Sequence, residues 1–303
     1  MSGTWSIGEL AERAGVTVKT VRFYSDRGLL PEAVRSAGGH RRYGLEALDR
    51  LRLIRALRTL DLPVPEVGRV LAEEDALEDV IAGRLRQVGS QLAALRWREA
   101  ALQLLRDCPA EERADRLRLV GAMTTPPSTD APARFWRRLL PARLPARLVS
   151  AIVEAAVPQP PADPTPAQVL AFARLHALTS RARFDSDQCR PEDRHVGERP
   201  AVLYDGLGEA YALASADLRA RRPPYQGEAL DCFVAAHAHS RGTRDTPAFR
   251  RQLGVRLARS ADPLISRYWE LAAELSGPPE PTMGAAHDWL RTALDAQSAS
   301  SAR

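Results

Sequence analysis

Residues 5–43 read WSIGELAERAGVTVKTVRFYSDRGLLPEAVRSAGGHRRY, and this stretch decides the fold of the amino-terminal part of the chain. Ser6 stands three residues before Glu9, which is the spacing of a capping box that begins a helix. Gly15 supplies the left-handed residue that ends this helix, and Thr17 is an N-cap residue for a second one. The stretch therefore opens with two predicted helices joined by a tight glycine turn.

A loop or small β-hairpin is predicted after the second helix. Gly28 closes that helix, and Pro31 prevents its continuation. Residues 32–43 must then leave as a loop or hairpin with Gly38-Gly39 at its tip. Two short helices followed by a projecting hairpin form a winged helix-turn-helix, which is a fold that reads duplex DNA.

The charged side chains of this unit suit contact with DNA, because a guanidinium is permanently charged and can bind two phosphate oxygens at once. The wing carries Arg35, Arg41 and Arg42. We expect the second helix to turn Val18, Val21 and Leu29 towards the first helix. We expect its outer side to present Lys19, Thr20, Arg22 and Tyr24. For any single arginine the alternative is an ordinary solvated charge, and Arg22 could instead brace the wing through Asp26.

These residues resemble the mercury-resistance (MerR) family of winged-helix transcription regulators. The resemblance covers residues 4–106, and its motifs are SIGELA at 6–11, GVTVKTVRFY at 15–24, GLLP at 28–31 and GHRRY at 39–43. Phe23, His40 and Pro63 depart from the residues that are usual in the family. By this resemblance the DNA contacts would come from Thr17, Lys19, Thr20, Arg22 and Tyr24 of the second helix and from Arg41 and Tyr43 of the wing.

Composition agrees with a DNA partner and argues against a membrane protein. Lys and Arg number 43 against 38 Asp and Glu, which gives a net charge of +5, and the surplus in residues 1–70 lies where DNA would bind. No signal peptide opens the chain, and no apolar run approaches the roughly twenty residues of a membrane span. We therefore expect a cytoplasmic protein. Three cysteines that lie far apart argue against a disulfide framework.

Residues 76–106 predict a coiled-coil dimerisation helix. Gly83 and Gly89 each lower helix stability by about 1 kcal/mol relative to alanine, so the helix is expected to rely on a partner. The alternative is a helix packed on its own carboxy-terminal domain. By the resemblance it would pair antiparallel with a second copy, giving a two-fold dimer and a palindromic site. In the seam, apolar residues recur at alternating spacings of three and four, interrupted only at Glu99. The seam is Ile81, Leu85, Val88, Leu92, Leu95 and Leu102.

The rest of the chain predicts a linker and an all-α domain. Prolines loosen the pattern over residues 107–133, and an arginine-rich amphipathic segment at 134–157 is broken at Pro141 and Pro145. Further helices are predicted at 167–182, 201–220, 227–240, 246–261, 263–275 and 283–296. The fold class is therefore mainly α: a winged helix-turn-helix domain with a small β-hairpin wing (1–75), a long dimerisation helix (76–106), a linker (107–133) and a carboxy-terminal all-α bundle (134–303).

Metal and cofactor sites are not expected. Cys108 has no second thiol near it with which to form a soft metal site. Cys232 and His239 are seven residues apart and would share a helical face, whereas His237 would not, and two ligands are too few. The sequence DRHVG at 193–197 resembles the loop of cobalamin-binding light sensors, but its spacing is one residue short.

An aromatic-lined cavity is the remaining candidate for an effector site. Aromatic residues in a helical bundle more often form the core, although tyrosines would supply polar groups on an apolar wall. A weaker likeness to helical antibiotic-recognition domains favours a bulky, partly apolar small molecule. The candidate residues are Trp136, Tyr204, Tyr211, Tyr225, Phe233, Tyr268 and Trp269.

The predicted function is that of a ligand-responsive transcription regulator. By the resemblance, a homodimer would bind a palindromic promoter site and distort the DNA so that RNA polymerase can engage it. The alternatives are a metal-responsive regulator, or an enzyme or scaffold that the winged domain tethers to DNA. The chain shows no G-x-S-x-G, no phosphate-binding loop and no H-E-x-x-H motif, so we do not expect an enzyme.

Overall fold

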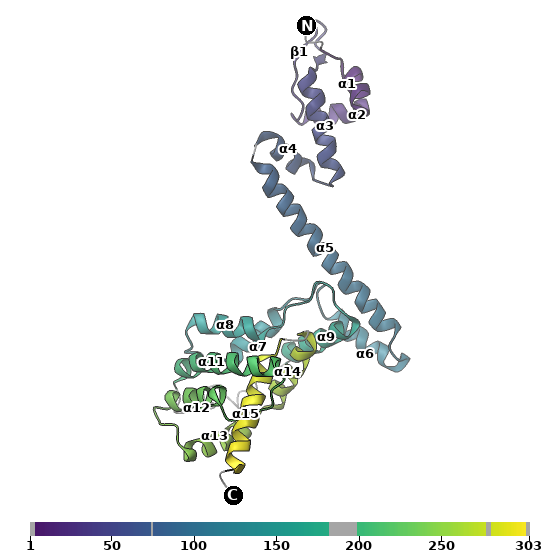
Figure 1. Cartoon of the computed structure of the whole chain (residues 1–303). Helices are drawn as coiled ribbons and strands as arrows, with labels where there is room; N and C mark the ends of the chain where they lie inside the picture. The colour runs from purple at the N-terminus through teal and green to yellow at the C-terminus, as the bar shows by residue number, and fades with distance from the viewer. Residues whose placement is uncertain (1–3, 74, 182–198, 277–279, 301–303) are drawn as a thin grey trace. The chain divides into compact units, whose positions relative to one another are not determined.

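The computed structural model describes residues 4–73, 75–181, 199–276 and 280–300 of the 303-residue chain. Cys189 and the DRHVG sequence at 193–197 lie outside the described residues. The chain divides into two compact units, residues 1–91 and 92–303. The described residues are mainly helical with one two-stranded hairpin, as the sequence predicted (Figure 1).

The first unit contains the winged helix-turn-helix. Its elements are α1 (Ile7–Ala14), α2 (Val18–Asp26), β1 (Val34–Arg35), β2 (Arg41–Arg42), α3 (Leu45–Thr59) and α4 (Val64–Ala72). The predicted capping box is present, because the Ser6 N–H donates to the Glu9 carboxylate at 2.6 Å and the Glu9 N–H donates to the Ser6 hydroxyl at 3.3 Å. Gly15, at φ 64°, ends α1 as expected.

The wing is an antiparallel hairpin in which Val34 lies opposite Arg42 and Arg35 opposite Arg41. A bridge between Trp5 and Tyr43 continues the pairing to the amino-terminal strand segment. The core beneath it is apolar and draws on α1, α2, α3 and the base of the wing. Its fully buried members include Leu10, Val21, Tyr43, Leu51 and Ile54.

Helix α5 (Ala76–Arg106) is continuous, and the division between the units falls within it at Gln91 rather than at its end. Figure 1 shows it as one uninterrupted helix. The predicted alternative, packing on the carboxy-terminal domain, occurs on one face, where Trp97, Ala100 and Leu104 are buried in the core of the second unit.

The second unit is all helical in its described residues. Its helices after α5 are α6 (Ala110–Gly121), α7 (Asp130–Leu139), α8 (Ala146–Ala156), α9 (Pro166–Arg181), α11 (Pro200–Arg219), α12 (Glu228–Ser240), α13 (Pro247–Arg259), α14 (Pro263–Leu275) and α15 (Met283–Ser300). The segment 107–133, which the sequence predicted as a linker, contains helix α6, and this helix packs against α9.

Two apolar clusters stabilise the second unit. One gathers α5, α7, α8, α9 and α14 around Phe135, Phe172 and Tyr268, and the other gathers α11, α12, α13 and α15 around Phe233 and Leu290. Tyr204 packs against both clusters.

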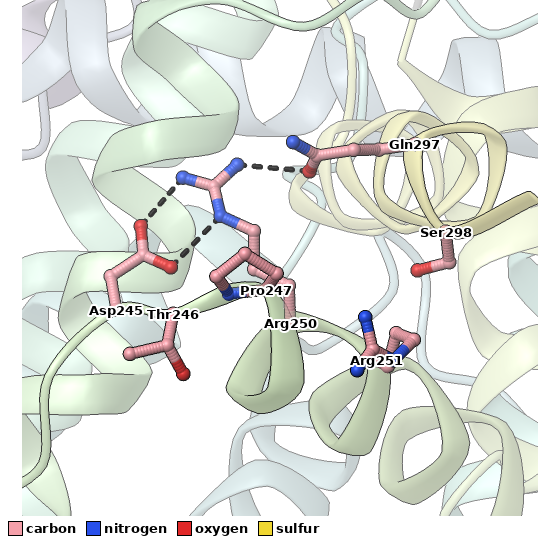
Figure 2. Close-up of a pocket in the computed structure, with 7 residues that line it drawn as sticks. All are labelled: Asp245, Thr246, Pro247, Arg250, Arg251, Gln297 and Ser298. Carbon is pink, nitrogen blue, oxygen red and sulfur yellow. Dashed lines mark hydrogen bonds and ion pairs between the residues drawn. The ribbon is translucent and has the colours of Figure 1, made fainter. Parts of the chain in front are cut away.

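Arg250 joins three helices at one end of the second cluster. Its guanidinium forms ion pairs with Asp245 at 2.6 Å and with Asp231 at 2.7 Å, and it donates to the Gln297 side chain at 2.9 Å. Figure 2 shows Asp245, Arg250 and Gln297 side by side in a pocket of about 240 Å³. The hydrogen bond with Asp245 is the main cause that raises the pKa of Arg250 above its usual value. We interpret this group as a clasp between α12, α13 and α15.

Among the described residues, every helix is too short or too polar to cross a membrane.

Candidate nucleic-acid interface

Helix α2 begins at Thr17 as predicted. The Thr17 hydroxyl accepts a hydrogen bond from the Thr20 N–H at 3.1 Å, and the two hydroxyl oxygens lie 2.8 Å apart. Thr17, Lys19 and Arg22 are exposed, and Thr20 is half-buried. The outer side of α2 therefore offers a hydroxyl pair and two cations, which are groups that hydrogen-bond and neutralise DNA phosphates.

Two placements on α2 differ from the sequence prediction. Tyr24 is buried rather than outward, because it follows Val21 by three residues and so shares the face that packs on α1. Val18, which we expected on the apolar side, is 40% exposed in the first turn of the helix. Tyr24 is thus part of the core and is removed from the candidate DNA contacts. Phe23 is exposed, and the Arg27 guanidinium lies 3.6 Å from the centre of its ring.

Tyr43 also belongs to the core and not to the DNA-facing surface. Its side chain is fully buried, and its hydroxyl oxygen lies 2.8 Å from the Ser25 hydroxyl oxygen. A buried ring in this position fastens the base of the wing to the end of α2. The expectation of a direct DNA contact from Tyr43 is therefore wrong.

Arg41 braces the wing, which is the role that the sequence suggested for Arg22. Its guanidinium contacts Asp26 at 2.5 Å and Glu32 at 2.6 Å, and it donates to the Ser25 hydroxyl at 3.2 Å. The hydrogen bond to Asp26 is the main cause that raises the pKa of Arg41. Arg22 forms no ion pair within the part of the chain that the structure describes, so its charge is available to a ligand.

The other two wing arginines differ in their surroundings. Arg42 donates to the Thr4 carbonyl oxygen at 2.9 Å and lies 4.0 Å from the Glu9 carboxylate, so it fixes the amino-terminal segment to the wing. Arg35 is exposed, with Glu32 at 3.4 Å. Of the three, Arg35 has the side chain that is most open to solvent.

A groove of about 430 Å³ separates α2 from the wing. Arg22, Arg41, Arg42 and His40 bring basic groups to it, and Asp26 is its acidic member. Ser6 and Ile7, at the start of α1, also line the groove, so the positive end of that helix adds to the charge of the arginine side chains. The groove can hold a phosphate or a stretch of sugar-phosphate backbone.

Helix α5 presents an apolar stripe that the described residues of the chain leave exposed. The exposed fractions run from 40% at Ile81 to 68% at Leu102, and the stripe consists of Leu77, Ile81, Leu85, Val88, Leu92, Leu95 and Leu102. The buried face of α5 carries Trp97, Ala100 and Leu104, on the opposite side at 100° per residue. The α5 stripe is therefore a second apolar face, separate from the one that packs on the second unit.

The seven predicted effector residues do not line one cavity. Phe233 and Tyr268 are fully buried core residues in different clusters, and Tyr225 is 44% exposed against Trp289. Tyr268 donates from its hydroxyl to the Ala156 carbonyl oxygen at 2.8 Å, so its polar group is already bonded within the core. The sequence shows which aromatic residues belong to this domain, but it does not show which of them line the same cavity.

Two of the hollows in the second unit bear on the effector prediction. A pocket of about 160 Å³ has Trp136, Trp269 and His287 in its wall, so two of the predicted residues meet there. A groove of about 670 Å³ between α6, α9 and α14 has an apolar lining that includes Leu178 and Leu271. Its rim carries Arg174, Arg181 and Arg267, which the sequence did not single out.

The histidine in the wall of the smaller pocket, His287, is held by neighbouring aromatic residues. His287 Nδ1 is 3.1 Å from the Tyr211 hydroxyl, and the Phe233 ring packs edge-on against the imidazole. Burial lowers the pKa of His287 to about 4. The imidazole is therefore neutral near pH 7.

The described residues include no group of three or more His, Cys, Asp and Glu side chains that could hold a metal ion. Cys232 is half-buried with its sulfur 3.9 Å from the Gly206 carbonyl oxygen, and burial raises the pKa of its thiol.

The capped α1–α2 pair and the hairpin beside it define a winged helix-turn-helix protein. The model of the MerR HTH family regulatory protein matches residues 5–74. The "HTH-type transcriptional regulator ZntR homolog" of Haemophilus influenzae is 31% identical over 121 residues, which cover 38% of this chain and 90% of that protein. The chain belongs to the MerR family of helix-turn-helix regulatory proteins.

Two further relatives match a smaller share of their own length. The "Nodulation protein NolA" of Bradyrhizobium sp. (strain NC92) is 40% identical over 89 residues, 29% of this chain and 38% of that protein. The "HTH-type transcriptional activator TipA" of Streptomyces coelicolor is 40% identical over 123 residues, 41% of this chain and 46% of that protein. The chain thus spans less than half the length of these two relatives.

Proposed function

We propose that this protein is a DNA-binding transcription regulator that acts as a homodimer on a two-fold symmetric promoter site and responds to a small-molecule effector. The observation that carries the proposal is the α5 stripe, because pairing of two copies along it brings two winged domains into one DNA-binding molecule. The transcription regulators to which the chain is similar support the DNA-binding part of the proposal.

The α5 stripe has the pattern of a coiled-coil seam. Burying each Leu, Ile or Val fully is worth about 1.5–3 kcal/mol, so a stripe of this length favours association with a matching surface. In an antiparallel pair with the two-fold axis at Ser90, Val88 lies opposite Leu92 of the second copy and Leu85 lies opposite its Leu95. The central part of the stripe, from Leu85 to Leu95, is then complementary to itself, as a two-fold interface requires.

The DNA-facing surface of each copy would consist of exposed groups on α2 and the wing. Thr17, Lys19 and Arg22 are the contacts that we retain on α2, and Arg35 is the most exposed contact on the wing. Two such surfaces related by a two-fold axis fit a palindromic site. Bending or untwisting a duplex costs on the order of 1–6 kcal/mol, so a change in the dimer could set whether RNA polymerase engages the promoter.

The effector is proposed to bind the groove between α6, α9 and α14. The groove is the larger of the two hollows and combines an apolar lining with arginines, which suits a bulky molecule with an anionic group. Leu119 of α6 lines it, and α6 follows α5 after only three residues. An effector bound in this groove can therefore act on the dimerisation helix α5 through α6.

The proposal is tested by selecting bound duplexes from a random pool with the purified full-length protein. We expect one symmetric motif, with half-sites separated by whole turns of the double helix. Recovery of no motif above random duplex would remove the regulator proposal. The metal-responsive and DNA-tethered enzyme alternatives have no specific observation in their favour among the described residues.

A further inference from the structure

The segment from Arg134 to Arg147 carries five arginines and no acidic residue. We name as the arginine patch the residues Arg134, Arg137, Arg138, Arg143 and Arg147. All five are exposed, on α7, the turn after it and the first turn of α8. Within the described parts of the chain none of the five forms an ion pair.

Several arginines elsewhere in the second unit form ion pairs with carboxylates. Arg116 contacts Glu112 at 2.5 Å, and Arg222 contacts Asp217 at 2.5 Å. Arg267 contacts Glu270 at 2.6 Å. These pairs lie within one helix or just beyond its end, whereas the segment of the arginine patch offers its five arginines no acidic residue. Pairing within the chain therefore does not account for the patch.

The helix dipole accounts for only part of the patch. Arg137 and Arg138 lie in the last turn of α7, where a cation is stabilised. Arg134 lies earlier in the helix, and Arg143 lies in the turn. Arg147 lies in the first turn of α8, where a cation is unfavourable. Three of the five charges are thus placed where they bring no evident gain in stability.

The apolar side of the same segment is not available to a partner. Phe135, Trp136, Leu140 and Leu144 are buried in the core of the second unit. A basic amphipathic helix binds a membrane by inserting its apolar face, and here that face is already covered. Only the charged side can meet a ligand, so recognition must be electrostatic.

We propose that the arginine patch binds the phosphate backbone of the duplex that flanks the promoter site. The inference rests on the proposed function, because tethering through the amino-terminal unit raises the local concentration of DNA at the patch. Guanidinium groups match phosphates in charge and geometry, and contact of this kind carries no sequence preference. The second unit thereby extends the DNA-binding surface beyond the bases that the winged domain reads.

The test compares two duplexes and three forms of the full-length protein. One duplex is the symmetric motif recovered by selection, and the other adds about 20 base pairs, roughly 70 Å, of arbitrary sequence on each side. The test variant is Arg134→Gln/Arg143→Gln/Arg147→Gln, which keeps the two arginines that stabilise α7. The matched control is Arg244→Gln/Arg251→Gln/Arg259→Gln, which removes the same charge from three other exposed arginines of the second unit.

The wild-type protein should bind the flanked duplex more tightly, with a steeper fall of log affinity against log salt. Each lost phosphate contact lowers that slope by about 0.9, so the test variant should lose roughly 2 to 3 per protomer on the flanked duplex. It should bind the short duplex like wild type, and the control should match wild type on both. Circular dichroism melting confirms that the variants are folded.

Three results would overturn the inference. The test variant could keep the wild-type slope on the flanked duplex, the two triple variants could lose the same amount, or the loss could appear on the short duplex as well. Reduced transcription with unchanged DNA binding would also overturn it and indicate an acidic protein surface instead. Failure of wild type to prefer the short motif over random duplex contradicts the proposed function itself, so the two failures are distinguishable.

Discussion

At the scale of single residues, the winged domain separates side chains that build the wing from side chains that face outward. Arg41, Arg42 and Tyr43 are consecutive, and the sequence assigned all three to DNA. In the structure Arg41 pairs with Asp26 and Glu32, and Tyr43 is buried against Ser25. These contacts join residues nine to eighteen positions apart, so no local pattern could have predicted them.

Replacing Arg41 and replacing Arg22 should therefore have different effects. Arg41→Ala removes the contacts that hold the wing to α2, so it should lower the melting temperature as well as the affinity for DNA. Arg22→Ala removes an exposed charge, so it should weaken DNA binding several-fold and leave the melting temperature within about 1 °C of wild type. Thermal melting and a salt titration of DNA binding measure both effects. A stable Arg41→Ala protein would contradict the bracing role.

His287 predicts a dependence of stability on pH. Its pKa is lowered by burial from 6.5 to about 4, so the unfolded chain binds more protons than the folded chain between these values. Stability should therefore be fully present above pH 6.5 and fall by about 1 kcal/mol per pH unit as the pH drops towards 4. Asp288, Arg291 and His237 also act on this imidazole.

Comparing His287→Gln with wild type isolates this effect. Urea unfolding at several pH values should show a smaller acid loss in the variant than in wild type. Parallel curves for the two proteins would mean that other groups carry the acid sensitivity. Both proteins have the same carboxylates, so the contribution of these groups to the acid loss of stability cancels in the comparison.

At the scale of elements, helix starts with a local signal were predicted within one or two residues. Thr246 caps α13 through the Phe249 N–H and Asp262 caps α14 through the Leu264 N–H, and both helices begin at the proline that follows. Helix α6 was missed because prolines surround it, although Pro109 stands at its start. Proline before a helix is compatible with its first turn, so the linker interpretation gave this residue too much weight.

Helix α15 lies very close to α14 at one glycine. A Cβ built on Gly284 would stand 2.1 Å from Cγ of Trp269, so the tryptophan ring occupies the space of a side chain. Gly284→Ala should displace this ring and lower the free energy of unfolding by about 1–3 kcal/mol. Urea unfolding measures the loss.

Gly208 provides the matched control for that substitution. It lies within α11, and a Cβ there would meet no atom within 4 Å. Gly208→Ala should therefore be neutral or stabilise the protein by up to about 1 kcal/mol, because alanine favours the helix. Equal effects of the two substitutions would contradict the close packing of α14 on α15.

At the scale of the whole molecule, the sequence predicted the exposed apolar positions of α5 better than it predicted which aromatic residues lie together. The α5 stripe was predicted residue by residue, because a seam repeats along one helix. The sequence offered packing on the carboxy-terminal domain as an alternative but did not identify Trp97 as part of that face. The partners of Trp97 lie on α9 and in the segment before it, where the Pro161 carbonyl oxygen accepts a hydrogen bond from Trp97 at 3.0 Å. Which of the predicted effector residues lie together could not be predicted for the same reason, because only tertiary packing decides which aromatics share a pocket.

The central claim, that the α5 stripe makes this protein a dimer, is tested most directly by sedimentation equilibrium. Leu85→Glu/Leu95→Glu places carboxylates opposite one another in the antiparallel pair, and we expect a monomer that keeps its helical circular dichroism. Gln87→Glu/Ser90→Glu adds the same charge off the stripe, and we expect it to remain a dimer like wild type. A monomeric wild-type protein, or a stripe variant that still sediments as a dimer, would contradict the account.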